Sequence, residues 1–283
     1  MAHYNRVIDV LLSKGVKPVV TLYHFDLPQA LLDNYGGWCS AEIIPAFSAY
    51  AEACFVAFGD RVKIWITVNE PTVDLAFNSG YHAPEDIEAA DTAIAFRAGW
   101  FLDPLTFGHY PEVIGKTWGE ALPSFTDEES ELVKDSIDFL GLNFYTGLYV
   151  SGKPVNDLSN TPAFPVTFPS NVYIGDFRDQ IPIGKLEQDL GFIPKSLESV
   201  VLMLKTKYGN IVTYITENGY AELRNPELSL EEKLHCQDDA RIQYIREHLR
   251  AVVSALKGGV NVQGLFVWSL LNNFEWLWGY QYQ

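Results

Sequence analysis

The sequence predicts an α/β fold in which helices cover a parallel sheet. Short runs rich in β-branched and aromatic residues alternate with longer amphipathic runs along the chain. Such strongly apolar strands are typical of sheets that are buried on both faces, and these are mostly parallel. Polar side chains gather where the strands end, and a parallel sheet brings those carboxyl ends to one edge. The alternation and this clustering together define the fold class.

The first half of the chain alternates helices with two strands. Helices are predicted over residues 4–14, 41–58 and 85–101, and strands over residues 18–25 and 62–70. Gly15, followed by Pro18, ends the first helix, and Gly59 with Asp60 closes the second. The first strand therefore reads "PVVTLYHF" and the second reads "VKIWITVNE".

The second half continues the same alternation. Strands are predicted over residues 137–147, 211–217 and 262–271, and helices over residues 194–208 and 229–257. Residues 148–192 are rich in Pro, Gly, Asn and Ser and are expected to form a loop. We find no internal repeat, low-complexity segment or clear linker, so we expect a single, partial catalytic domain over residues 1–283.

Composition narrows the classes of partner. The net charge of −16 argues against nucleic acid, and no apolar run is long enough to span a membrane. The first residues lack the features of a signal peptide and instead predict an amphipathic helix. Cys39, Cys54 and Cys236 are odd in number and lack zinc-ligand spacing, which favours free or buried thiols over a disulfide. Compartment and oligomeric state stay open.

Two predicted strands end on a glutamate. The strand "VKIWITVNEP" ends at Asn69 and Glu70, and "IVTYITENGY" carries Glu217 beside Asn218. The other polar and aromatic side chains at strand ends are His24, Phe25, Asp26, Asn143, Phe144, Tyr145, Trp268, Asn272, Asn273, Glu275 and Trp276.

This mixture of side chains suits a neutral polyhydroxyl ligand. Amides and carboxylates bond hydroxyl groups, indole faces pack on sugar rings, and no basic cluster is present for phosphate. Paired carboxylates in one cavity indicate glycoside hydrolysis, with one acid ionised and the other protonated. The alternative is that Glu70 and Glu217 are strand-end residues in surface ion pairs, and that the aromatic residues pack the core.

Six ordered motifs resemble the β-glucosidases of glycoside hydrolase family 1, the plant members most closely. They are "TLYHFDLPQALLDNYGGW", "GDRVKIWITVNEP", "FRAGWFLDPLTFGHYP", "IDFLGLNFYTG", "YITENG" and "WSLLNNFEW". The resemblance implies a (β/α)8 TIM barrel and retaining hydrolysis of small-molecule β-D-glucosides. It implies no metal and no cofactor. Related plant enzymes are often extracellular or vacuolar.

The resemblance also assigns roles to residues. Glu70 matches the acid/base, Glu217 the nucleophile, Asn69 the amide that binds the sugar 2-hydroxyl, and Tyr145 the phenol that touches the nucleophile. The residues that match the glucose-binding set are His24, Trp268, Glu275 and Trp276. A glutamate at position 70 argues against a thioglucosidase, where the family has Gln. Retaining enzymes hold their two carboxyl groups about 5–5.5 Å apart, so this separation is expected for Glu70 and Glu217.

The chain departs from the family in length and in strand count. About five of the eight barrel strands are recognisable, so we expect an incomplete barrel. The first two strands, with a family Gln and Arg, have no counterpart, and the last helix is missing. A second gap follows "GYHAP", where Pro84 leads directly into "EDIEAADTAIAF". The alternative to an active β-glucosidase is therefore a catalytically impaired pseudoenzyme or a sugar-binding fragment.

Overall fold

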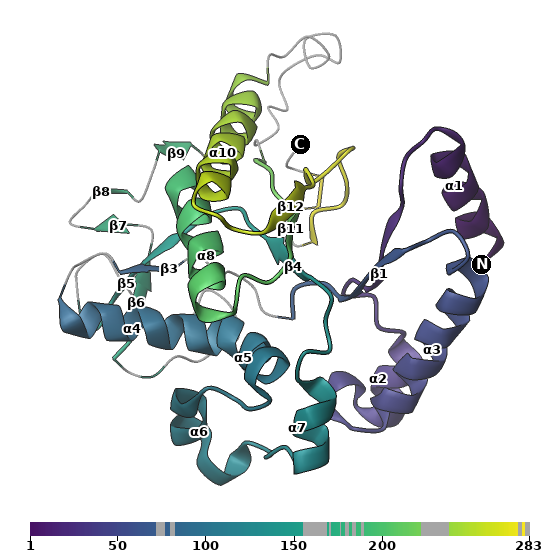
Figure 1. Ribbon diagram of the computed structural model, residues 1–283, viewed down its shortest axis with the longest axis horizontal. Coiled ribbons are helices and arrows are strands. Elements are labelled where there is room, and N and C mark those ends of the chain that lie inside the picture. The colour runs from purple at the N-terminus through teal and green to yellow at the C-terminus, as the bar shows by residue number, and fades with distance from the viewer. Residues whose placement is uncertain are drawn as a thin grey trace. The chain divides into compact units, whose positions relative to one another are not determined.

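A computed structural model describes most of the chain, and Figure 1 traces it from purple to yellow. The described residues are 1–71, 77–79, 83–154, 169, 171–175, 177–178, 181–182, 185–187, 190–221, 238–276 and 279–280. The chain divides into two compact units, Met1–Pro71 and Thr72–Gln283. The single domain expected from the sequence stays a prediction.

The first unit is a pair of parallel strands with helices. Its elements are α1 (Ala2–Ser13), β1 (Val19–Tyr23), α2 (Gln29–Tyr35), a 3-10 turn (Gly37–Cys39), α3 (Ile43–Phe58) and β2 (Ile64–Val68). Strand β1 pairs in parallel with β2, with Val19 opposite Ile64 and Tyr23 opposite Val68. The small core consists of Ile8, Leu22, Cys54, Phe58 and Val62. Both predicted strands and the helix predicted over 41–58 are confirmed with shorter bounds, the helix predicted over 4–14 spans Ala2–Ser13, and α2 was not predicted.

One arginine joins α1 to the turn that leads into β2. The Arg61 guanidinium donates to Asp9 Oδ1 at 2.6 Å and to Asp60 Oδ1 at 3.0 Å. It also donates to Asn5 Oδ1 at 2.5 Å. The hydrogen bond from Arg61 lowers the pKa of the exposed Asp60 carboxyl. This shared cation fixes α1 against the strand pair.

The second unit contains most of the described helices and the larger parallel sheet. Its helices are α4 (Pro84–Ile94), α5 (Trp100–Phe107), α6 (Glu112–Trp118), α7 (Asp127–Val133), α8 (Pro194–Lys207) and α10 (Asp239–Lys257). A π-helical segment, Ala95–Gly99, joins α4 to α5, and a 3-10 turn, Gly119–Ala121, follows α6. Its longer strands are β4 (Leu140–Asn143), β5 (Leu148–Ser151), β11 (Thr213–Glu217) and β12 (Val262–Leu265).

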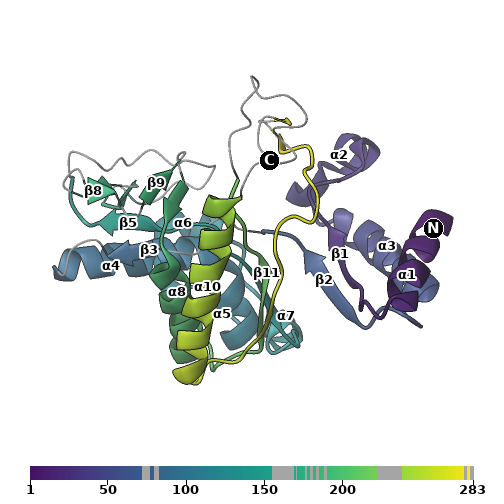
Figure 2. The ribbon, with the colours of Figure 1, turned by 90° about the horizontal axis from the view of Figure 1, so that it is seen from above.

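The larger parallel sheet has the order β12-β11-β4. Ile215 of β11 lies opposite Leu142 of β4 and Leu265 of β12. Helices α8 and α10 lie side by side along this sheet, as Figure 2 shows. Their apolar faces meet the strands in one core that includes Leu142, Leu197, Val201, Ile215, Val252 and Ala255. The β-branched and leucine content of the strands supplies the surface that both helices cover.

The prediction that residues 148–192 form a loop is wrong in part. Strand β5 pairs in parallel with β3 (Phe77–Ser79) and antiparallel with β6 (Tyr173–Gly175). Two further short hairpins follow: β7 (Phe177–Arg178) with β8 (Ile181–Pro182), and β9 (Lys185–Glu187) with β10 (Leu190–Phe192). Pro, Gly and Asn are common both in loops and in the turns of hairpins, so composition does not separate the two.

Several other predicted bounds change. The helix expected over residues 85–101 continues through the π-helical segment to Phe107 and ends at Gly108, whose φ is 79°. The strands expected over residues 137–147 and 262–271 shorten to β4 and β12. The last long helix, predicted from residue 229, is described from Asp239, and residues 229–237 lie outside the described residues. Cys39 and Cys54 are free thiols, as predicted, and Cys236 lies outside the described residues.

Five parallel strands of the expected barrel are present, namely β1, β2, β4, β11 and β12. Among the described residues they form separate sheets of two and three strands rather than a closed barrel. No single described helix is long and apolar enough to cross a membrane, although one bent pair, residues 29–39 with 43–58, passes by length and composition. The barrel is incomplete, as the sequence predicts.

Helix α10 carries a second apolar stripe that faces solvent. Tyr244, His248 and Val252 face the core, whereas Ile242, Leu249 and Val253 are about half exposed. A helix that is apolar on two sides normally buries both of them. This exposed stripe is an aggregation hazard.

The adjacent valines of α10 give a matched test of this stripe. We expect Val253→Lys to change the free energy of unfolding by less than about 0.5 kcal/mol and to reduce aggregation in light scattering. Val252, only 8% exposed, is the control, and Val252→Lys should cost more than about 3 kcal/mol because it buries an unpaired charge. An equal loss of stability in both variants would show that the stripe is covered in solution.

Candidate active site

In the first unit the ends of β1 and β2 bring His24 next to Asn69. Asn69 N donates to Tyr23 O at 2.8 Å, which continues the parallel ladder past the end of β2. The Asn69 Nδ2 atom lies 3.3 Å from His24 Nε2. Because an amide nitrogen only donates, His24 Nε2 accepts this bond. The two predicted sugar-binding side chains of this unit are therefore in contact, with Asn69 buried.

In the second unit the ends of β4 and β11 bring Tyr145 onto Glu217. Phe144 N donates to Glu217 O at 2.9 Å, again one step beyond the strand. The Tyr145 hydroxyl donates to Glu217 Oε2 at 2.5 Å. Glu217 is 7% exposed, so this carboxylate faces few water molecules. A hydrogen bond from a phenol favours the ionised form of the carboxyl group, as a nucleophile requires.

The segment after β12 lies close against the segment after β11. Trp268 N donates to Asn218 O at 3.0 Å. A Cβ placed on Gly219 would lie 2.1 Å from the Trp268 carbonyl oxygen, so only glycine fits there. Farther along, Glu275 and Trp276 lie in a turn in which Glu275 N donates to Gly279 O at 2.7 Å. The structure thus places Trp268 beside the residue that follows Glu217.

Three predicted site segments share an unusual backbone conformation. Phe25, Glu70 and Trp276 have φ of 63°, 42° and 44°, in the left-handed region that bulky residues rarely adopt. The other two described non-glycine residues with positive φ are Asp135 and Asn210, whose side chains tolerate this region. Such conformations cost about 1–3 kcal/mol and cluster at functional sites. No local pattern in the amino-acid sequence predicts these positive φ angles.

The predicted site residues fall into two groups. His24, Asn69 and Glu70 belong to the first unit, and the others, namely Tyr145, Glu217, Trp268, Glu275 and Trp276, belong to the second. The separation of about 5–5.5 Å between the two carboxyl groups therefore stays a prediction. Among the described residues no group of three or more His, Cys, Asp or Glu could hold a metal ion.

A buried network that the sequence analysis missed lies behind Glu217. Asn218 Nδ2 donates to Phe144 O at 2.9 Å and to the Tyr244 hydroxyl at 3.2 Å. His248 Nδ1 donates to Tyr244 O at 2.8 Å, and the two rings stack with centroids 3.9 Å apart. The available signal was a Tyr and a His four residues apart on the core face of α10.

Burial sets the protonation of this network. Desolvation lowers the pKa of His248 to about 4, although the backbone bond to Tyr244 and the Glu247 charge raise it. Burial also raises the pKa of Tyr244 well above its usual range. At neutral pH the imidazole is uncharged and the phenol keeps its proton.

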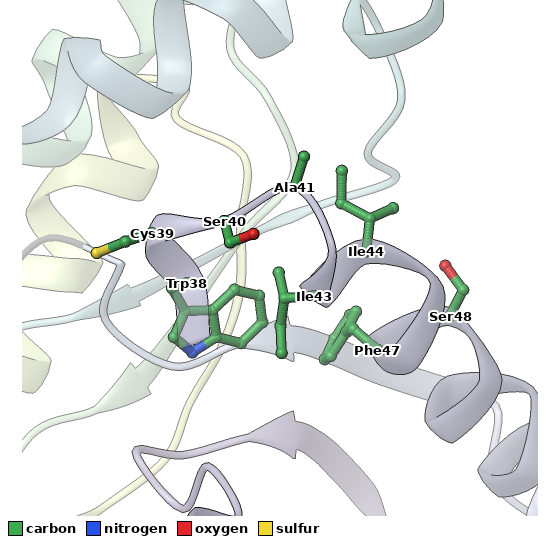
Figure 3. A pocket seen from close by; sticks show the side chains of 8 residues that line it. All are labelled: Trp38, Cys39, Ser40, Ala41, Ile43, Ile44, Phe47 and Ser48. Atoms are coloured by element: carbon green, nitrogen blue, oxygen red, sulfur yellow. The ribbon is translucent and has the colours of Figure 1, made fainter. Parts of the chain in front are cut away.

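The apolar hollow in Figure 3 is not this site. It has a volume of about 360 Å³ and lies where the 3-10 turn meets α3. Its walls are Trp38, Cys39, Ser40, Ala41, Ile43, Ile44, Phe47 and Ser48. None of the residues predicted to bind sugar lines it, and its largest ring, Trp38, packs edge-on against Tyr23 at 4.9 Å. We therefore assign it no part in the chemistry.

Parallel strands with a carboxylate and a phenol paired at their ends are the arrangement expected of an α/β-barrel glycosidase. The sequence profile of Glycosyl hydrolase family 1 matches residues 1–86 and 80–283. The chain belongs to this family. It is thus a β-glucosidase-like glycoside hydrolase of the O-glycosyl type, and the retaining mechanism is characteristic of the family.

Plant β-glucosidases are among the most similar curated proteins. β-Glucosidase 12 of Oryza sativa subsp. indica is 38% identical over 98% of this chain and 67% of its own length. β-Glucosidase 40 of Arabidopsis thaliana is 36% identical over 98% of this chain and 68% of its own. The crystal structure of a rice Os3BGlu6 β-glucosidase superimposes with a TM-score of 0.89 at 33% identity, covering all of this chain and 73% of that one.

The comparisons also locate the internal gap. The chain spans about two thirds of the length of these curated relatives. The alignment with the rice protein runs over 349 positions, more than the 283 residues present, so it opens gaps in this chain. The two matches to the family profile meet at residues 80–86, where the sequence analysis places the missing stretch. The internal deletion is confirmed.

Acid should weaken the fold through His248. Its folded pKa of about 4 lies below its usual value of 6.5, so the unfolded chain binds more protons between these pH values. The stabilisation is complete above about pH 6.5 and is lost as the pH falls toward 4, a change of about 3 kcal/mol. Urea unfolding from pH 7 to 4 measures it.

His248→Asn should flatten this pH dependence because an amide keeps the bond to Tyr244 O without gaining charge. The control is His109→Asn, which alters an exposed imidazole and should leave the wild-type dependence in place. Identical losses in the wild type and His248→Asn would show that His248 does not titrate on unfolding as expected.

Proposed function

We propose that this chain hydrolyses β-D-glucosides with retention, with Glu217 as the nucleophile and Glu70 as the acid/base. The observation that carries the proposal is the 2.5 Å hydrogen bond from Tyr145 to the buried Glu217 carboxylate. An ordinary strand-end glutamate in a surface ion pair would be exposed. Glu217 instead is buried and accepts a hydrogen bond from a phenol.

The proposed reaction has two displacements. Glu217 Oε attacks the anomeric carbon while the Glu70 carboxylic acid gives its proton to the departing aglycone oxygen. Glu70, now ionised, takes a proton from water, and that water breaks the glycosyl ester and frees glucose. Support for the covalent step comes from a related structure, a rice Os3BGlu6 variant described as a covalent complex with Glc, which matches with a TM-score of 0.90.

The remaining predicted residues would hold the sugar. Asn69 is proposed to bond the 2-hydroxyl, a contact that strengthens in the transition state. His24 touches Asn69 and would bond a neighbouring hydroxyl. Trp268 and Trp276 offer indole faces, and Glu275 offers a carboxylate. One relative, from Hellenia speciosa, is named a furostanol glycoside 26-O-β-glucosidase, whereas others are named only as β-glucosidases. We therefore propose glucose as the sugar that is released and leave the aglycone open.

The second candidate is a catalytically impaired, sugar-binding chain. It is favoured by the five parallel strands among the described residues, which do not close a barrel. A thermal melt combined with an aryl β-glucoside assay separates the candidates. Turnover supports the enzyme, whereas a cooperative melt with glucose binding and no turnover supports the binder.

Covalent trapping tests the proposed nucleophile. A 2-fluoro glucoside with a good leaving group should form a stable ester on Glu217, because the fluorine slows both formation and hydrolysis of the ester whereas the leaving group speeds formation alone. Peptide mass mapping locates the label. Glu217→Gln should abolish labelling, and Glu128→Gln, on the exposed face of α7, is the control that should not change it.

Glu70→Gln distinguishes the acid/base from the nucleophile. Loss of the general acid should slow release of poor leaving groups by about 10²–10⁴-fold and affect activated ones much less. A label on any residue other than Glu217, or equal slowing for all leaving groups in Glu70→Gln, would contradict these roles.

A further inference from the structure

We propose that Tyr244 is a positioning residue for the nucleophile. Its hydroxyl group fixes the backbone of Tyr145 and the side chain of Asn218, and thereby fixes the hydrogen bond that Tyr145 donates to Glu217. The inference rests on the proposed role of Glu217. Tyr244 lies on α10, and its hydroxyl group bonds Tyr145 O and Asn218 Nδ2.

The contacts of the Tyr244 hydroxyl join three elements. It donates to Tyr145 O at 2.5 Å and accepts from Asn218 Nδ2 at 3.2 Å. Asn218 Nδ2 also donates to Phe144 O at 2.9 Å. One hydroxyl oxygen therefore links α10, the end of β4 and the end of β11. Both strand ends carry groups proposed for catalysis.

The Tyr244 ring is held on two sides. Tyr244 is 2% exposed, its ring stacks on His248 with centroids 3.9 Å apart, and the tilted ring of Tyr220 lies at 5.7 Å. His248 Nδ1 donates to Tyr244 O, which ties the stacked pair to the helix backbone. A ring packed in this way keeps its hydroxyl in one place, as a positioning group must.

The anchored backbone decides where the Tyr145 phenol lies. Tyr244 bonds the carbonyl of the same residue whose hydroxyl reaches Glu217. The neighbouring Phe144 is held from both sides, through its N–H by Glu217 O and through its carbonyl by Asn218. A 2.5 Å hydrogen bond depends steeply on distance and angle, so a small shift of this backbone weakens it.

Packing alone does not explain a tyrosine here. A phenylalanine would fill the same space without burying a hydroxyl, which is costly unless it is bonded. Burial raises the pKa of Tyr244, so the group remains a donor at neutral pH. The hydroxyl donates one bond and accepts another, and both run to residues that take part in or adjoin the catalytic contact.

Tyr244→Phe tests this role, with Tyr208→Phe as the matched control. Tyr208 is also buried, lies at the C-terminal end of α8, and donates to Asp103 Oδ1 at 2.7 Å. Both variants lose one buried hydroxyl, at a similar cost in stability of about 1–3 kcal/mol. Thermal melts establish that each variant is folded before it is compared.

The first readout is the rate at which a 2-fluoro glucoside labels Glu217. Tyr244→Phe should slow labelling by about 10²-fold, because a small displacement of a reacting group lowers the rate by about that factor. The glucoside concentration that gives the half-maximal labelling rate should change little. The acid limb of its pH profile should move to higher pH, because a misaligned Tyr145 stabilises the carboxylate less. Tyr208→Phe should do neither.

The second readout needs no turnover. The Glu217 carboxyl group is titrated by ¹³C NMR in glutamate-labelled chain and assigned by its loss in Glu217→Gln. Its midpoint should move to higher pH in Tyr244→Phe and stay at the wild-type value in Tyr208→Phe. An unchanged midpoint in folded Tyr244→Phe overturns the positioning role. Absence of any label in the wild type overturns the proposed function instead, and the titration then decides on Tyr244 alone.

Discussion

The site depends on backbone hydrogen bonds that continue just past the ends of parallel strands. Asn69 N to Tyr23 O, Phe144 N to Glu217 O and Trp268 N to Asn218 O are three examples of one geometry. Each bond holds two chain segments together at the point where their side chains leave the sheet. The contacts of His24 with Asn69 and of Tyr145 with Glu217 follow from this pairing. A slip of register by one residue would turn these side chains to the opposite face.

Strained backbone accompanies this pairing. Phe25 and Glu70 come directly after His24 and Asn69, and both have positive φ. A strand that continued regularly would send the next side chain to the other face, whereas the left-handed residue turns the chain at once. The cost of about 1–3 kcal/mol at each residue is offset by the packing of the strand pair on the core of the first unit.

The strands and their polar ends could be predicted from the sequence, because an apolar run that stops at a carboxylate is a local signal. The sequence analysis missed β5 to β10, since turn residues look alike in loops and hairpins. It also missed Tyr244 and His248, because their role depends on which strand ends α10 covers, and amphipathic spacing only shows that they face the core. Positive φ at Phe25, Glu70 and Trp276 arises from tertiary packing and leaves no local pattern.

The two proposed catalytic carboxylates lie at the ends of sheets that differ in size and in the size of their cores. Glu217 ends the central strand of a three-stranded sheet that α8 and α10 cover, and its core is the largest in the described chain. Glu70 follows an edge of a two-stranded sheet with a core of five buried residues. Small sheets are marginal by themselves, so the first unit should open more readily than the second. Attack by Glu217 on an activated glucoside needs little help from a general acid, whereas natural aglycones leave only with a proton. Local opening of the first unit would therefore remove the proton donor that natural aglycones need, together with the proposed sugar contacts of His24 and Asn69.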